Sequence, residues 1–263
     1  MYRGFIVLLC AFPCLLSGCL FGQRAVLPVD NSVVRDQLVI YTDFDLPRRH
    51  RLINELVALR SRLAATLQLP TSDEPIHVYL FDSSKQYQKF MDRHYSDFAS
   101  RRAFFVRTDT NLTVYAHWGD RVAEDLQHEV AHGYLHSVVP HLPLWLDEGL
   151  AEYFEVPKGL RGVNPPHVKL LMEKYTKDKW TPDLKRLERL TDAIEMDQMD
   201  YAESWLWVHM LLESTPDRLE IIRTNLKTMR DNGTAPPLSK LVEQMEPSPE
   251  RSLFQHLKSL VED

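Results

Sequence analysis

Residues 121–155 read RVAEDLQHEVAHGYLHSVVPHLPLWLDEGLAEYFE, and this stretch decides which fold to expect. Its first half predicts a helix over about residues 121–138, which Pro140 closes. After a loop that contains Pro143, its second half predicts another helix over residues 144–155. The residues with recognisable chemistry are concentrated in these two helices.

The first of these helices contains the HExxH motif HEVAH at residues 128–132. Positions i and i+4 lie on one helix face with Cβ atoms roughly 5–6 Å apart, so His128 and His132 can bind one Zn²⁺ together. Glu129 points in a different direction and would stand beside the ion, where it could take a proton from a metal-bound water. The motif alone also occurs by chance, because histidine and glutamate are common in helices.

The segment before the two helices is predicted to mix strands and helices. The predicted strands are residues 33–41, 76–81, 103–107 and 112–116, and the predicted helices are residues 48–69 and a helix capped by Asp82 or Ser83 that ends at His94. Residues 108–111, between the last two strands, are predicted to form a hairpin loop.

The rest of the chain is predicted to be helical, after a turn-rich loop over residues 156–166. The predicted helices cover residues 168–177, 183–196, 202–213, 216–230, 237–245 and 248–261. Mixed elements followed by helices alone predict an α+β fold with a small mixed or antiparallel sheet and a helical C-terminal lobe. The expected boundaries are 32–156 for the α+β domain with the metal site and 157–263 for the lobe.

The first residues are predicted to direct export. Residues 1–18 resemble a signal peptide with an apolar core too short to span a membrane, and Leu16-Ser17-Gly18-Cys19 resembles the lipobox of bacterial lipoproteins. The resemblance implies cleavage before Cys19, lipidation of its thiol and a tether over residues 19–31. The protein would then be anchored to a membrane of the bacterial cell envelope, with its domain outside the cytoplasm. The alternative is an ordinary signal peptide with an incidental cysteine.

Composition limits the other possibilities. Of 263 residues, 44% are hydrophobic and 26% charged, which excludes a disordered, collagen-like or polytopic membrane protein. A net charge of −6 without long basic runs argues against nucleic acid as a partner. All three cysteines, the last of them Cys19, lie at or before the expected cleavage site, so no disulfide is expected in the mature domain.

The second helix carries two carboxylates four residues apart, Glu148 and Glu152, within WLDEGLAEYF. Here the sequence resembles the gluzincin zinc metallopeptidases, in which a glutamate after HExxH is the third zinc ligand. The resemblance implies a zincin-like fold, with Glu148 as that ligand and Glu152 hydrogen-bonded to a ligand histidine. Within this group, residues 39–155 are most similar to bacterial lipoproteins of unknown function that carry DUF1570 peptidase-like domains.

The sequence departs from the gluzincin pattern in three ways. Asp147 stands where gluzincins usually have asparagine, which changes a hydrogen bond to the substrate or to a ligand. Only fifteen residues separate His132 from Glu148, so the connecting loop is tighter than in the larger aminopeptidases. No GxMEN-like segment precedes the motif, so aminopeptidase specificity is not expected.

Two other histidines could compete for the third position on the metal. His136 continues the i+4 series, but it lies roughly 12 Å along the helix from His128, so it is expected to face solvent or pack against the loop. His141 lies in the connecting loop and could approach the site. The metzincin pattern is excluded, because Leu135 and Val138 occupy the positions of its glycine and its third histidine.

The same resemblance implies residues that bind and activate the substrate. In gluzincins an edge strand pairs with the substrate backbone, and this role falls to Asn111, Leu112, Thr113, Val114 and Tyr115. An interior hairpin strand is the alternative.

The oxyanion of peptide hydrolysis also needs a donor beside the zinc. Tyr201 is the first choice and His209 the second. Alternatively, Tyr201 caps and packs its helix.

The sequence therefore predicts a membrane-anchored zinc metallopeptidase with one Zn²⁺ per chain, acting on a peptide or protein substrate. Its ligands would be His128, His132 and Glu148, with Glu129 as general base. Two alternatives remain at this point: an envelope binding or scaffold lipoprotein with a structural zinc site, and a zinc hydrolase of a non-peptide amide. The sequence indicates neither the oligomeric state nor which peptide or protein is cleaved.

Overall fold

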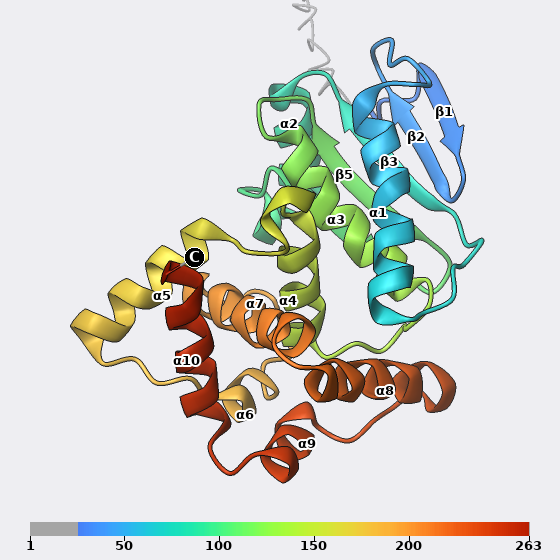
Figure 1. The fold of residues 1–263 in the computed structure, drawn as a ribbon. Coiled ribbons are helices and arrows are strands. Elements are labelled where there is room, and N and C mark those ends of the chain that lie inside the picture. The colour runs from blue at the N-terminus through green and yellow to red at the C-terminus, as the bar shows by residue number, and fades with distance from the viewer. Residues whose placement is uncertain (1–25, 263) are drawn as a thin grey trace, which may run out of the picture.

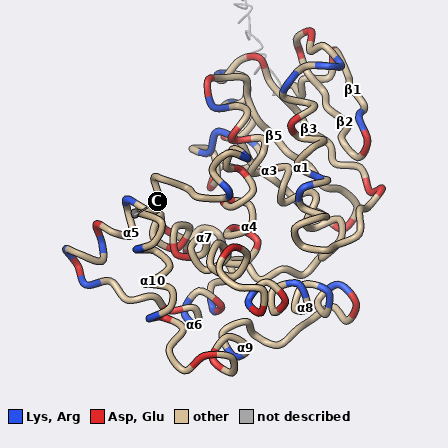
Figure 2. Tube along the Cα trace, viewed as in Figure 1, with Lys and Arg blue, Asp and Glu red and all other residues tan. Residues whose placement is uncertain are grey.

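The structure of the chain is a computed structural model that describes residues 26–262 (Figure 1). The predicted signal peptide, Cys19 and the first half of the predicted tether lie outside the described residues. Within residues 26–262 no helix has both the length and the apolar character needed to cross a membrane. Figure 2 shows basic and acidic residues mixed along the trace.

A five-stranded mixed sheet forms the N-terminal part. Its order is β1-β2-β3-β5-β4, in which β2, β3 and β5 run parallel and the outer strands run antiparallel to their neighbours. The strands are β1 (Asn31–Arg35), β2 (Leu38–Thr42), β3 (Ile76–Phe81), β4 (Ala103–Arg107) and β5 (Leu112–His117).

The single strand predicted over residues 33–41 was wrong, because the chain turns back in the middle of it. Asp36 has a φ of 49°, and β1 and β2 pair across this turn as a hairpin. Aspartate tolerates the left-handed conformation better than most residues, which is why a tight turn fits here.

Helices cover both faces of the sheet (Figure 1). α1 (Arg51–Leu67) and α3 (Val122–His136) share the main hydrophobic core with inward residues of the strands, such as Val78 and Val114. α2 (Ser84–His94) packs on the opposite face through a smaller aromatic cluster that contains Phe81. Alternate residues of a strand point to opposite faces, so one strand supplies both cores.

The C-terminal part is helical, and the α+β class predicted from the sequence is confirmed. Its elements are α4 (Leu144–Glu155), α5 (Pro165–Asp178), α6 (Leu184–Leu187), α7 (Gln198–Glu213), α8 (Pro216–Asn232), α9 (Leu238–Met245) and α10 (Pro249–Glu262), with a short 3₁₀ turn at Lys158–Leu160. Another 3₁₀ turn, Ser96–Phe98, lies between α2 and β4 in the N-terminal part. The main core continues from the sheet through α4 to α7 and α8, while the division at residue 156 stays a prediction.

The helix predicted over residues 183–196 was wrong in length, since only α6 forms there. Leu184 and Leu187 are buried, but Ile194 is exposed, so no apolar face continues along the segment. The Asp192 carboxylate accepts a hydrogen bond from the backbone N–H of Ile194, which holds a turn instead of a helix.

Helix α7 runs through the middle of the C-terminal part and packs closely against α4 (Figure 1). The contact depends on Gly149, because a Cβ at this position would lie 2.5 Å from the backbone oxygen of Ser204. The two helix backbones therefore touch one residue after Glu148. This approach brings the start of α7, with Tyr201, toward the predicted metal site.

Candidate metal centre

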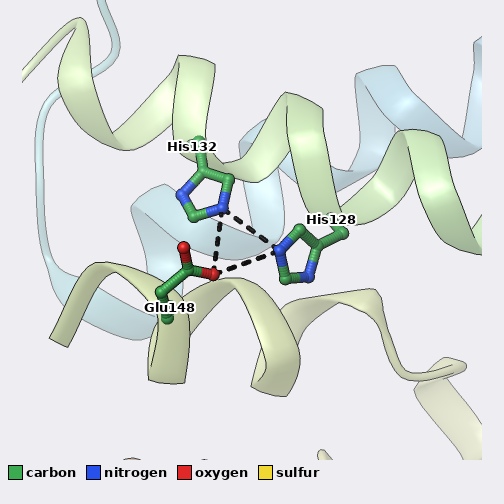
Figure 3. A group of neighbouring side chains, drawn as sticks. All are labelled: His128, His132 and Glu148. Carbon is green, nitrogen blue, oxygen red and sulfur yellow. Dashed lines mark hydrogen bonds and ion pairs between the residues drawn. The ribbon is translucent and has the colours of Figure 1, made fainter. Parts of the chain in front are cut away.

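Helices α3 and α4 bring the three predicted ligands together (Figure 3). The Nε2 atoms of His128 and His132 lie 3.2 Å apart. Oε2 of Glu148 lies 3.4 Å from Nε2 of His128 and 3.6 Å from Nε2 of His132. The three atoms thus form a nearly equilateral triangle.

The triangle fits a tetrahedral zinc site. Ligand atoms at about 2.0–2.1 Å from a zinc ion stand about 3.3 Å from one another in a tetrahedron. Oε2 of Glu148 is buried and has no hydrogen-bond partner among the residues that the structure describes. A cation would satisfy this buried oxygen, which otherwise makes no hydrogen bond.

Carboxylates behind the imidazoles set which nitrogen faces the centre. Nδ1 of His128 lies 2.9 Å from Oε2 of Glu155, and Nδ1 of His132 lies 2.9 Å from Oδ1 of Asp147. The hydrogen bond to Glu155 places the ring proton of His128 on Nδ1 and leaves the lone pair on Nε2, and the ion pair with Asp147 favours the same tautomer of His132. Two such lone pairs facing each other at 3.2 Å repel unless a cation or a proton lies between them.

Asp147 also contacts a histidine that the sequence had left as a possible ligand. Its Oδ2 lies 2.8 Å from Nε2 of His136, whose ring stacks on Phe105. The expectation that His136 faces solvent or packs against the loop was therefore wrong, because a carboxylate holds it one turn beyond the ligands. His141 is exposed in the loop after α3.

Glu152 was expected to hydrogen-bond a ligand histidine, but in the structure it pairs with other residues. Its Oε2 bonds Nε2 of His167 at 2.8 Å and Nδ2 of Asn164 at 3.3 Å, both at the start of α5. Glu155, one turn later, takes the position behind His128. Sequence reasoning missed Glu155, although it also lies on the face of α4 that carries Glu148 and Glu152, and this spacing could have indicated it.

The pKa values of the centre reflect this arrangement. Burial lowers the pKa of His132, but Asp147 and Glu148 outweigh burial and raise it to about 10. Burial likewise opposes the charged form of His128, yet Glu148 and Glu155 hold its pKa well above the ordinary value. Burial raises the pKa of Glu148, while the two histidines bring it down to about 2. The field of these carboxylates therefore favours positive charge at both imidazoles.

Glu129 lies beside the triangle without being part of it. Its side chain is buried at 8% exposure and borders a cleft of about 1420 Å³ that runs past the centre. Burial raises the pKa of Glu129, an effect that His128 and His132 partly offset. A carboxylate whose pKa is raised toward neutrality, next to a cation site, is suited to accept and release a proton.

Tyr201, from the first turn of α7, borders the same cleft. Its hydroxyl accepts a hydrogen bond of 3.0 Å from Nη2 of Arg101, which precedes β4 and also borders the cleft. Sequence reasoning missed Arg101, because no local pattern links it to a tyrosine 100 residues away. His209, the second choice as oxyanion donor, instead bonds His256 of α10 at 2.8 Å.

The predicted substrate strand lies inside the sheet. Leu112, Thr113, Val114 and Tyr115 belong to β5, which pairs with β3 on one side and β4 on the other. Their assignment to an edge strand was wrong, since the loop over residues 108–111, with Asn111 at its end, folds β4 outside β5. Within the described residues, β4 is the edge strand on this side of the sheet, and its first residue Ala103 borders the cleft.

Comparison with known families identifies one match. Residues 122–232 match the family described as "Protein of unknown function (DUF1570)". The match extends from α3 to α8 and so includes the HExxH motif, Glu148 and Tyr201. No curated protein matches the chain.

Proposed function

We propose that this protein is a zinc metallopeptidase. The observation that carries the proposal is the triangle of Nε2, Nε2 and Oε2 atoms with sides of 3.2, 3.4 and 3.6 Å, backed by a carboxylate behind each imidazole. Such a site with three protein ligands leaves a fourth position open, as catalytic zinc sites do. Glu129 of the HExxH motif borders the same cleft as His128.

The residues of the chain divide the work of peptide hydrolysis. A zinc ion held by His128, His132 and Glu148 would supply Lewis acidity for a carbonyl oxygen and lower the pKa of water. Glu129 takes the proton from the attacking water and delivers it to the leaving amine. Tyr201 donates a hydrogen bond to the oxyanion that forms on the carbonyl oxygen. Asp147 and Glu155 keep the two imidazoles in the ligating tautomer.

The free edge of β4 suits the backbone of an extended peptide. A strand edge reads any peptide through main-chain hydrogen bonds and leaves selectivity to the pockets around it. This edge begins at Ala103 on the border of the cleft, so it takes over the role that the sequence had given to residues 111–115. We expect the substrate to be a peptide or an unfolded segment of a protein.

The proposal includes a location. A lipid on Cys19 would attach the protein to a membrane of the bacterial cell envelope, with the cleft outside the cytoplasm. Mass spectrometry of the membrane fraction tests this part: a diacylated or triacylated Cys19 supports it, and an unmodified chain in the soluble fraction contradicts it.

The test of the activity compares wild type with Glu129→Gln in the zinc-loaded protein. Each variant is assayed for bound zinc and for cleavage of a fluorescence-quenched peptide library. We expect one zinc per chain in both, with hydrolysis by Glu129→Gln lower by roughly 10²–10⁴-fold, as for loss of a general base. Glu220→Gln, which changes the same residue type on the exposed surface of α8, is the control.

Three outcomes would contradict the proposal. Folded wild type without zinc after supplementation would exclude the metal site. Zinc retained equally in both proteins without cleavage of any peptide would indicate a scaffold with structural zinc. Cleavage confined to non-peptide amides, added to the same assay, would indicate the third class of hydrolase.

A further inference from the structure

We propose that Arg101 is a positioning residue that fixes the direction of the Tyr201 hydroxyl proton. The inference rests on the proposed function, because it assigns a role to a residue of the same cleft. It begins from one contact, the 3.0 Å hydrogen bond in which Nη2 of Arg101 donates to the phenol oxygen of Tyr201.

A phenol hydroxyl has one proton and accepts through its oxygen lone pairs. Because Arg101 can only donate, it occupies a lone pair of Tyr201, and the phenol proton must turn away from the guanidinium. Both side chains border the cleft that also contains Glu129. With the guanidinium on one side of the oxygen, the hydroxyl is prepared to donate into the cleft, where the oxyanion of peptide hydrolysis needs a donor.

Arg101 is itself held in place by aromatic residues. The Tyr87 hydroxyl donates a hydrogen bond of 3.0 Å to the backbone oxygen of Arg101. The guanidinium carbon lies 5.3 Å from the ring centre of Phe98 and 6.0 Å from that of Phe104, within cation–π range. Because the Arg101 backbone is held by Tyr87 and its guanidinium lies beside two rings, the side chain loses little further freedom when it binds Tyr201.

The neighbouring residue ties this segment to the catalytic helix. The Arg102 guanidinium binds the Asp125 carboxylate through Nε at 3.0 Å and Nη2 at 2.6 Å. Asp125 lies one turn before Glu129 on α3. Arg102 therefore fixes the segment to the HExxH helix, and Arg101 extends from it to Tyr201 on α7.

The charge of Arg101 has no other partner to neutralise it directly. Among the residues of the described structure, no carboxylate lies within ion-pair distance of its guanidinium. Burial lowers the pKa of Arg101, but Tyr201, and after it Glu148 and Glu129, outweigh burial and raise it. Burial and Glu148 raise the pKa of Tyr201, and Arg101 lowers it. The cation therefore makes Tyr201 a better hydrogen-bond donor than burial alone would allow.

The first test is kinetic and uses the zinc-loaded enzyme with a peptide that the library assay identifies as a substrate. We expect Arg101→Met to lower kcat by about 10–100-fold, part of the 10²–10³-fold that removal of an oxyanion donor costs, with KM nearly unchanged. Arg101→Lys should recover part of the loss, because an ammonium can donate one hydrogen bond to the phenol. The double variant with Tyr201→Phe should be no slower than Tyr201→Phe alone.

Two kinetic results would overturn the proposal. An increase in KM with unchanged kcat would mean that the guanidinium binds the substrate directly. Losses that multiply in the double variant would mean that Arg101 acts independently of Tyr201.

The second test needs no catalysis and so separates this inference from the proposed function. 3-Nitrotyrosine is placed at position 201, and its ionisation is followed by absorbance with and without zinc. The groups that face it are Arg101, Glu148 and His128. Arg101→Met should raise the pKa of this phenol, whereas Arg121→Met, which removes another cation from the border of the cleft, should not. An unchanged pKa in Arg101→Met would contradict the contact even if the enzyme is active.

Discussion

Among residues 26–262, two pairs of histidines are in contact, and the groups around the two pairs differ in charge. His128 and His132 face each other through Nε2 atoms 3.2 Å apart, with carboxylates at both Nδ1 atoms. His209 and His256 lie between α7 and α10 and share a hydrogen bond of 2.8 Å. Around His209 are the rings of Tyr153 and Trp205.

The pKa values of the two pairs move in opposite directions. The carboxylates hold the pKa of His128 and of His132 above the ordinary value, in spite of burial. Burial lowers the pKa of His209 and of His256 to about 4. The first pair attracts positive charge and the second excludes it, so the carboxylates behind a histidine pair, and not the pair itself, distinguish a metal centre from a structural contact.

The difference between the two histidine pairs is most directly tested by the effect of zinc on folding stability. With free zinc at about 1,000 times its Kd, the wild-type free energy of unfolding should increase by about 4 kcal/mol. His132→Ala should abolish this increase, and His209→Gln, in the other pair, should retain it. Urea unfolding with zinc and with a chelator measures the difference; equal stabilisation of both variants would show that zinc binds elsewhere.

The second pair should make stability depend on pH. Both pKa values fall from 6.5 to about 4 on folding, so the unfolded chain binds more protons in this range. The contribution of each histidine, about 3 kcal/mol, is complete above about pH 6.5 and is lost as the pH falls toward 4.

The measurement is urea unfolding at pH 7 and pH 5 for wild type and for the His209→Gln/His256→Gln double variant. The loss of stability on acidification should be smaller in the variant. Arg161 faces His209, while Arg218 and Glu213 face His256. An equal loss in both proteins would show that the pair is not neutral in the folded state.

The smallest expected effect concerns the carboxylates of α4. Glu155→Gln should weaken zinc binding by about 10–100-fold, as changes behind a ligand histidine do, and Glu152→Gln should weaken it less. Competition with a chromophoric chelator gives both affinities. The reverse order would restore Glu152 to the role that the sequence had assigned to it.

Much of the fold could be predicted because local patterns determine it. The HExxH spacing and the apolar residues around Glu148 predicted α3 and α4, and β-branched runs predicted β3 and the hairpin of β4 and β5. The turn at Asp36 was missed, because two short β-branched runs, residues 33–34 and 38–41, were taken as one strand across the polar residues 35–37. The order of strands in the sheet is set by distant contacts, which explains why β5 was taken for an edge.

At the site, the sequence could predict which residues carry the chemistry but not all of their partners. Glu152 and Glu155 lie on one face of α4, and the choice between them depends on the packing of α3 against α4. It also depends on His167 and Asn164, which bind Glu152 from the next helix. Arg101 comes from a loop with no repeating pattern, so only the folded chain places it beside Tyr201.

The contact of Gly149 with the backbone of Ser204 has a consequence for biosynthesis. α4 carries Glu148, but the surface that covers it belongs to α7, which ends at Glu213. A chain emerging from its amino end would expose HExxH and Glu148 long before their cover is made. The helix that carries Glu148 can be covered only once about four fifths of the protein is available to fold, so a metal ion at this site would be enclosed late in folding.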